Sequence, residues 1–438
     1  MRTAILARNV LLAGGALALF AACQSEPPKP AKTEKKAAAA PAKPAPKPKP
    51  VATEPPPPPP PPEPRREALE GGPYPTLLVS QAQFIDGPKG PVPGPAKLAI
   101  VRETPDGWVT TFVEDPDSNV FHKAVMYGDE VLTIGANQAM LKTWSFSDGM
   151  WTETTLWNPT FGGKFDRLRD IEIADVDGDG QDEMVIATHD QGEIVIVHPD
   201  EDHRIEKIDA QKDTFVHEIE IGDVDGDGGL EIFATPSKPN KLDQEQPGEV
   251  SMYKRGEDGT WTKSIVDAPG DTHAKEILAA NPDDEGPDEL YIVWEGAFAN
   301  GQLVRPVTIK EYRMKDGAWQ STVVTTVPDR QMRAIAAGDV NADGSIDMVA
   351  GGLGSGLWLF EQGDDGWTKT LIDDDSSGFE QPVLLADLDG DGNVEIYVGS
   401  EDQGELRRYV WKDGKWEKTA VAELGSGDIT WNVQDGNL

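Results

Sequence analysis

Cysteine is nearly absent from this sequence, and so are the motifs of the common enzyme classes. The 438 residues include one cysteine and six histidines, so the chain has no internal disulfide, and the histidines show no metal-ligand spacing. No HExxH, CxxC, GxSxG or Walker loop occurs. Helical periodicity is also missing after residue 70. The chain therefore carries no recognisable catalytic motif, and its folded part is expected to be all-β.

Positive charge is scarce outside the N-terminal segment. The chain has 40 Lys and Arg against 77 Asp and Glu, which gives a formal net charge of −37. Residues 1–66 hold eleven of the basic residues and four of the acidic ones, so the other 372 residues carry a net charge of −44. Because phosphate binding needs a basic surface, nucleic acid is a poor partner for the folded part.

The acidic residues are concentrated in a nine-residue motif that recurs along the chain. Strong copies begin at Asp175, Asp223, Asp339 and Asp387, and a weaker copy begins at Asn281. Each strong copy places a carboxylate or amide at positions 1, 3 and 5, a glycine at position 6 and an acid at position 9. Two carboxylates about 4 Å apart repel by roughly 4 kcal/mol unless a cation lies between them. Oxygen ligands and a glycine bend favour calcium, although a solvated Asp-Gly turn would explain any single copy.

The motif lies between strands rather than helices. Position 12 of the first copy is Ile186, where an EF-hand would need a glutamate, and the flanking sequences "IEIA" and "MVIAT" are strand patterns. The five copies are spaced by 48, 58, 58 and 48 residues. A second marker, Asp-Gly followed closely by Trp, recurs with them. The two markers define seven units of four strands, which begin near Ala96, Phe121, Leu168, Val216, His273, Gln331 and Glu380.

Seven such units predict an all-β fold, a seven-bladed β-propeller of four-stranded blades. A closed ring hides the strand edges that would otherwise pair with other chains. We expect the ring to close through Thr76–Ile85 and Ile429–Val433, one of which completes a blade begun by the other.

The repeated loop resembles the FG-GAP/VCBS repeats of integrin-α-like propellers, over roughly residues 96–425. In that family, loop oxygens bind calcium in the turn between the first and second strands of a blade. The resemblance implies four calcium sites, whose ligands are Asp175, Asp177, Asp179, Gln181 and Glu183; Asp223, Asp225, Asp227, Gly229 and Glu231; Asp339, Asn341, Asp343, Ser345 and Asp347; and Asp387, Asp389, Asp391, Asn393 and Glu395. A fifth site, left open because Pro287 stands at position 7, would use Asn281, Asp283, Glu285 and Glu289.

The N-terminal segment resembles that of a bacterial lipoprotein. Arg2 and Arg8 precede a short apolar run that is typical of a secretory signal, and the run ends in "LFAAC". This resemblance implies a signal peptide over residues 1–22 and acylation of Cys23, and Gln24 after it implies anchoring in the outer membrane, facing the periplasm or the outside. Residues 23–70 are expected to form a disordered tether rich in Pro, Lys and Ala, and residues 71–438 the propeller.

Basic side chains recur six residues before successive loops, at the starts of the strands that should line the central channel. They are Arg169, His217, Lys275 and Arg333, with Gln381 at the fifth place and His273 nearby. Such a ring would bind an anionic ligand in an otherwise acidic domain. Salt bridges to Asp170, Glu218, Glu276 and their neighbours are the simpler alternative.

Two functions remain open. The first is a non-catalytic, calcium-stabilised interaction platform at the cell envelope, favoured because every strong motif is structural. The second is an enzyme acting on carbohydrate, since the same repeats occur in propellers that resemble polysaccharide lyases and sugar dehydratases; His217, His273, Arg169 and Arg333 would then supply acid and base groups. Long connections at 236–249 and 295–306 place a protein or glycan partner on the face opposite the calcium loops.

Overall fold

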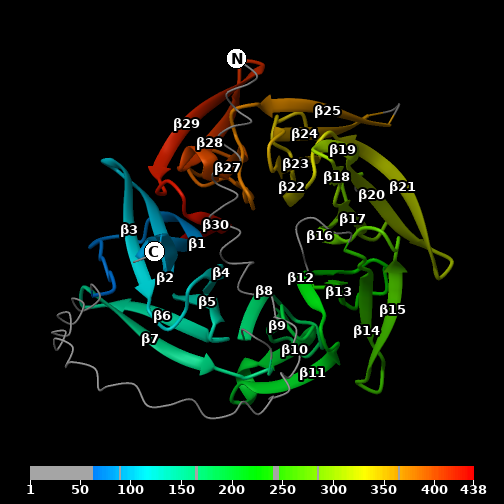
Figure 1. Ribbon diagram of the computed structural model, residues 1–438, viewed down its shortest axis with the longest axis horizontal. Coiled ribbons are helices and arrows are strands. Elements are labelled where there is room, and N and C mark those ends of the chain that lie inside the picture. Colours follow the sequence, from blue (N-terminus) through cyan, green and yellow to red (C-terminus); the bar gives the residue numbers. More distant parts are fainter. Residues whose placement is uncertain (1–62, 88–89, 163–165, 240–245, 284–285, 364–365) are drawn as a thin grey trace, which may run out of the picture.

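The computed structural model describes residues 63–87, 90–162, 166–239, 246–283, 286–363 and 366–438. These residues form thirty β-strands and two short 3-10 helices, η1 (Pro199–Glu201) and η2 (Glu401–Gln403). Figure 1 shows the sheets arranged as a ring, so the predicted all-β propeller with four-stranded blades is confirmed. None of the described helices is long and apolar enough to cross a bilayer. Cys23, Glu285 and most of the expected tether lie outside the described residues.

Seven strands contact one another in a closed circle around the centre. These innermost strands are β4 (Phe121–Tyr127), β8 (Asp166–Ala174), β12 (Phe215–Gly222), β16 (Ala274–Ala280), β22 (Met332–Gly338), β26 (Val383–Ala386) and β30 (Ile429–Asn437). The second strands are β1 (Pro75–Gly87), β5 (Glu130–Asn137), β9 (Glu183–Thr188), β13 (Glu231–Ser237), β17 (Glu289–Trp294), β23 (Asp347–Gly352) and β27 (Glu395–Ser400).

The third and fourth strands lie toward the rim. The third strands are β2 (Gly90–Thr104), β6 (Leu141–Ser147), β10 (Glu193–His198), β14 (Val250–Arg255), β20 (Val307–Lys315), β24 (Gly356–Gly363) and β28 (Glu405–Lys412). The outermost strands are β3 (Gly107–Asp115), β7 (Met150–Trp157), β11 (Arg204–Ala210), β15 (Trp261–Asp267), β21 (Ala318–Val327), β25 (Gly366–Asp373) and β29 (Lys415–Glu423).

The prediction of seven separate blades is confirmed only in part. Five four-stranded sheets are separate, but β4 to β11 form one eight-stranded sheet. The joint is short: β5 runs on to Asn137, so that Ala136 and Asn137 pair with Arg167 and Asp166 at the start of β8. A further two-stranded sheet, β18 (Ala297–Ala299) with β19 (Gln302–Arg305), forms within the long connection expected at 295–306.

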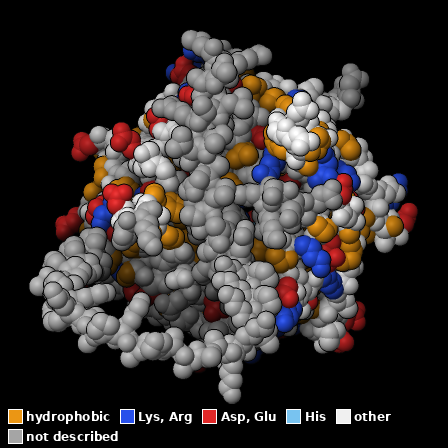
Figure 2. All heavy atoms as spheres, viewed as in Figure 1, with side chains coloured by type: hydrophobic (Ala, Val, Ile, Leu, Met, Phe, Trp, Pro, Cys, Tyr) orange, Lys and Arg blue, Asp and Glu red, His pale blue; other side chains and the backbone are white. Residues whose placement is uncertain are grey.

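The hydrophobic core lies between neighbouring sheets. Every residue of β9, β13, β17, β23 and β27 is buried, because a second strand is covered on both faces by the adjacent sheets. One core cluster joins Phe233 and Met252 of one sheet to Leu290, Ile292 and Tyr312 of the next. Outer strands such as β25 expose most of their side chains, and Figure 2 shows acidic and basic side chains interspersed around the rim of one face.

The two ends of the chain close the ring, as expected. β30, near the C-terminus, pairs with β1 from Pro75–Asn437 to Ala82–Ile429, and it becomes the innermost strand of the first sheet. The expected start of a unit near Ala96 is wrong, since Ala96 lies in the third strand of this sheet. The reason is that the C-terminal strand, not an N-terminal one, supplies the inner position.

A short segment before β1, which we call the strap (Arg65–Glu67), crosses the rim. Its backbone pairs with β3: Glu67 N–H donates to Phe112 O at 3.0 Å, and Glu114 N–H donates to Arg65 O at 2.9 Å. These residues fall within the stretch expected to be tether. The strap also contacts the neighbouring eight-stranded sheet, because the indole of Trp151 in β7 donates to Glu67 O at 2.9 Å.

Candidate metal loops and central polar cluster

The four strong acidic loops share one hydrogen-bond scheme. Each lies between a first and a second strand, as the resemblance implies. In the first loop, the carboxylate of Asp175 accepts backbone N–H groups from Gly178, Asp179 and Gly180 at 2.8, 3.1 and 2.9 Å. The position-1 aspartates of the other three loops accept equivalent N–H groups. The backbone of each loop is therefore folded around its position-1 carboxylate.

The remaining ligand positions are ordered in the same way. The acid at position 9 accepts the backbone N–H of position 2, for example Val176 to Glu183 at 3.1 Å and Leu388 to Glu395 at 3.2 Å. The glycine at position 6 has a positive φ, 93° at Gly180, which a residue with a side chain would adopt at a cost. In three of the loops at least three carboxylates have oxygens within 4.8 Å of one another. Oxygen-only donors on a bent loop fit calcium, which takes six to eight oxygens.

Side chains from the third strand also reach the loops. Lys254 in β14 donates to Asp225, Asp227 and Glu231 at 2.5, 2.7 and 2.9 Å. Arg408 in β28 binds Asp389 and Glu395. In the doubtful fifth loop, Arg313 in β20 binds both Asp283 and Glu289 at 2.9 Å. These basic residues lie outside the nine-residue motif and were not predicted as part of the loops.

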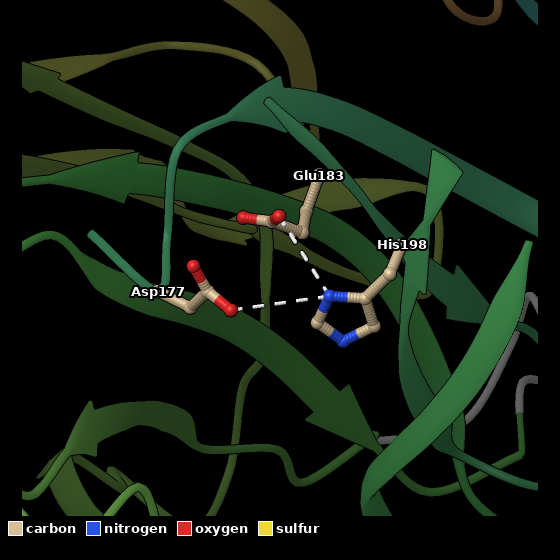
Figure 3. A group of neighbouring side chains, drawn as sticks. All are labelled: Asp177, Glu183 and His198. Carbon is tan, nitrogen blue, oxygen red and sulfur yellow. Dashed lines mark ion pairs between the residues drawn. The ribbon is translucent and has the colours of Figure 1, made fainter. Parts of the chain in front are cut away.

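In the two other strong loops, no third-strand cation is bound to the acids at positions 3 and 9 among the described residues. The loop at Asp175 has one cation from the neighbouring sheet, since Arg255 in β14 lies 3.9 Å from the Asp177 carboxylate and donates to its backbone oxygen at 3.0 Å. In the loop at Asp175, the third strand supplies His198, whose Nδ1 lies 4.0 Å from Asp177 and 3.7 Å from Glu183 (Figure 3). In the loop at Asp339, the third strand supplies an acid, since Asn341 Nδ2 donates to Glu361 at 3.4 Å. The loops that looked alike in sequence thus differ in their local charge.

The predicted ring of polar side chains is present at the opposite ends of the inner strands. In six of the seven innermost strands, the pairing register with the adjacent second strand shifts at one place. The shifts leave His122, Arg169, His217, Lys275, Arg333 and Trp431 without a direct partner in the ladder. Gln381 stands just before β26. A β-bulge re-aims side chains, and such bulges are common next to functional sites.

Four members of this ring lie close together with two glutamates, and they form two sets of contacts. The Lys275 ammonium lies 2.7 Å from Nε2 and 3.0 Å from Nδ1 of His217. Arg333 pairs with Glu380 and lies 3.5 Å from Glu295, while Arg169 lies 3.7 Å from Glu380. We call Arg169, His217, Lys275, Arg333, Glu295, Glu380 and the adjacent His273 the central cluster.

His273 completes the central cluster from the residue before β16. Its Nε2 lies 3.3 Å from Glu295, and its Nδ1 lies 3.0 Å from Gln246 O. The His217 and His273 rings are 6.0 Å apart between centroids. The candidate residues from the sequence therefore do converge, together with two acids that were not predicted.

Burial sets the protonation behaviour of the cluster. Burial and the charge of Arg333 hold the pKa of Lys275 well below its usual value. Burial and Lys275 likewise hold the pKa of His217 well below its usual value, and burial lowers the pKa of His273 to about 4. Burial alone would raise the pKa of Glu295, but His273, Arg333 and Lys275 lower it overall. A neutral imidazole and an easily deprotonated amine thus lie side by side.

The salt bridges expected as the simpler alternative are made by different residues. Asp170 pairs with Lys123 of β4 at 3.2 Å rather than with the ring. Burial and neighbouring carboxylates raise the pKa of Glu218 and of Glu276 well above the usual range. Arg333 and Arg169 are paired, but Lys275, which is only 3% exposed, has no carboxylate within ion-pair distance among the described residues.

Comparison with known proteins agrees with the fold. Residues 339–398 match the model of the FG-GAP-like repeat. A search of the curated proteins finds no match. Among solved structures, a putative 6-phosphogluconolactonase from Bacteroides fragilis has a TM-score of 0.52 at 12% identity, covering 83% of this chain and 98% of that one. A putative 6-phosphogluconolactonase from Bacteroides uniformis has a TM-score of 0.50 at 14% identity, covering 82% and 99%. At this identity the likeness concerns the fold alone, and the match to the FG-GAP-like repeat covers the segment with the Asp339 and Asp387 loops.

Proposed function

We propose that this protein is a calcium-stabilised β-propeller that binds an anionic group of a partner at the central cluster, without catalysing a reaction. The observation that carries this proposal is Lys275, a buried amine whose hydrogen-bond partner is an imidazole rather than a carboxylate. Among the described residues, Arg169, Lys275 and Arg333 share only two carboxylates, Glu295 and Glu380, so burial leaves Lys275 easily deprotonated, and an incoming carboxylate or phosphate would stabilise its charged form. The neighbouring arginines would add charge-assisted hydrogen bonds.

Calcium has a structural part in this proposal. The position-1 carboxylates already organise the loops, so a bound ion would neutralise the remaining acids and lock the turn between the first and second strands. The loops follow the inner strands, whereas the central cluster lies at the starts of those strands. The metal would therefore stabilise one face of the ring, and the partner would bind at the other.

The location is part of the same proposal. Acylation of Cys23 would hold the propeller at the outer membrane, with residues 23–62 as a spacer. We also propose that the eight-stranded sheet corresponds to two blades, β4 to β7 and β8 to β11, because two of the seven innermost strands belong to it. A tethered binding platform at the envelope agrees with the acidic surface, since it would not attach to nucleic acid.

Calorimetric titration of the full chain with inorganic phosphate and with glucuronate tests the anion site. Wild-type protein should bind at least one of them, and Lys275→Met should reduce the affinity at least about tenfold, which is about 1.4 kcal/mol. Lys207→Met is the matched control, because Lys207 lies on an outer strand with half of its side chain exposed. Unchanged affinity in Lys275→Met would refute the site.

A second candidate function, an enzyme acting on carbohydrate, is favoured by the His273–Glu295 pair. The two side chains are 3.3 Å apart and each is more than nine-tenths buried, which is a suitable arrangement for a general base. Incubation with acidic polysaccharides, followed by detection of new reducing or unsaturated ends, distinguishes the two. Product formation that is lost in His273→Asn would establish the enzyme.

A further inference from the structure

We infer that the third-strand residue facing each acidic loop decides whether that loop takes calcium. Lys254, Arg408 and Arg313 would act as built-in cations, so that calcium binds tightly only at the loops that begin at Asp175 and Asp339. This inference rests on the calcium part of the proposed function. It replaces the expectation of four equivalent sites with two sites and three self-neutralised loops.

Lys254 gives the clearest case. One ammonium donates to the carboxylates at positions 3, 5 and 9 of the Asp223 loop at distances of 2.5 to 2.9 Å. These are three of the positions that would ligate calcium, whose bonds to oxygen are about 2.3–2.6 Å long. The ammonium and the ion would therefore compete for the same oxygens. Calcium would have to break three charge-assisted hydrogen bonds and leave a positive charge close by.

Guanidinium groups fill two other loops in a similar way. Arg408 bridges positions 3 and 9 of the Asp387 loop, with 2.5 Å from its Nη2 to Glu395 Oε1. Arg313 bridges positions 3 and 9 of the fifth loop. A guanidinium is rigid and stays charged at any physiological pH, so these two loops keep their internal cation.

The loop at Asp339 has the opposite charge at the equivalent place. Met348 pairs with Phe360 and Ile232 pairs with Tyr253, so the next pairs in register are Asp347 with Glu361 and Glu231 with Lys254. Glu361 thus stands where Lys254 stands in the neighbouring loop. Asp347 is only 1% exposed, and its Oδ2 has no hydrogen-bond partner among the described residues. A buried carboxylate oxygen without a partner, beside a further acid, would be stabilised by a bound cation.

The loop at Asp175 also lacks a third-strand cation, and Arg255 of the neighbouring sheet lies 3.9 Å from Asp177 but pairs with no other acid of this loop among the described residues. His198 Nδ1 stays 3.7 Å from Glu183, beyond hydrogen-bond distance (Figure 3). Its Nε2 lies 3.2 Å from Glu206 on the outer strand. Glu183 is fully buried, and its Oε1 has no hydrogen-bond partner among the described residues. Both loops assigned to calcium thus contain an unpartnered buried oxygen at position 9, on a carboxylate that no Lys or Arg of the described chain binds. Glu289 of the fifth loop also has an unpartnered oxygen, but its other oxygen is paired with Arg313 at 2.9 Å.

Calcium titration of metal-free, full-length protein, followed by calorimetry, tests the inference through the number of ions bound. Wild-type protein should bind two ions tightly. Lys254→Met should gain a third, whereas Lys254→Arg, which keeps a cation there, should stay at two. Glu361→Lys places a cation at the same position of the Asp339 loop and should weaken one site at least about tenfold. Glu361→Gln should retain both sites, which separates charge from packing.

The outcomes separate this inference from the calcium part of the proposed function. Four or more equivalent tight sites in the wild type, or an unchanged count in Lys254→Met, would overturn the role of the third strand while leaving calcium binding intact. No binding to the wild type together with one ion bound by Lys254→Met would support the built-in cation and overturn calcium as a natural stabiliser. No binding by any variant would overturn both.

Discussion

Val79 in β1 pairs with Val433 in β30, and both side chains are buried in the core between the first and last sheets. The contact joins the beginning of the described propeller to its end. Because ring closure removes the free sheet edge, this pair belongs to the joint through which the two ends of the described chain close the ring.

The first prediction concerns this joint. Val433→Ala should lower the free energy of unfolding by about 1–3 kcal/mol, because it removes buried methyl groups and leaves a cavity. Val323→Ala is the matched control, since Val323 is 55% exposed, and should change stability by less than about 0.5 kcal/mol. Chemical denaturation measures both. Equal effects of the two variants would show that closure through β30 does not limit stability.

The second prediction concerns calcium. The melting temperature should be higher in millimolar calcium than in excess chelator, because an ion that binds only the folded chain stabilises it by mass action, by about 2.7 kcal/mol per site at a hundredfold excess over Kd. Asp179→Ala should remove only the contribution of its own loop. Asp258→Ala, in an exposed turn without the loop motif, is the control. Identical melting in calcium and chelator would contradict the prediction.

The third prediction concerns acid. His273 has its pKa lowered by burial from 6.5 to about 4, so between these values the unfolded chain binds a proton that the folded chain does not. Its contribution to stability is therefore present above pH 6.5 and is lost as the pH falls through about 4, on the order of 3 kcal/mol. His273→Asn, which keeps a polar side chain beside Glu295, should show a smaller loss of melting temperature between pH 7 and pH 4. A loss as large as that of the wild type would mean that His273 does not titrate in this way.

The fourth prediction concerns the anchor. If Cys23 is acylated, wild-type protein should be recovered with the membrane fraction, and Cys23→Ser should release or mislocalise it. The calcium dependence of melting should be the same in both proteins, because residues 24–62 separate Cys23 from the described propeller along the sequence. Recovery of the wild type wholly in the soluble fraction would end the proposal of a lipid anchor.

The acidic loops could be predicted from the sequence because their ligands lie within nine consecutive residues. Lys254 could not, since it lies 27 residues from Asp227 and meets it only through the register of β13 and β14. Only part of the central cluster could be predicted from the sequence. The recurrence of basic residues before each loop marked Arg169 and Arg333, but their acid partner Glu380 arrives from a different sheet.

The joined sheet was missed for a similar reason. Pairing between β5 and β8 depends on two residues, Ala136 and Asn137, at the end of a strand whose hydrophobic pattern is that of any second strand. Patterns of burial predict which residues form strands, but the neighbours of a strand end depend on the path of the chain between sheets.

The strap determines how the propeller would bear a mechanical load. A pull from the N-terminal side would first reach Arg65–Glu67, which are pinned to β3 by backbone hydrogen bonds and to β7 by Trp151 and Glu153. The force would then be shared between β3 and β7, which are outermost strands of two neighbouring sheets. β1 would not be peeled from β30, so the ring would stay closed while the chain is pulled from its N-terminal side.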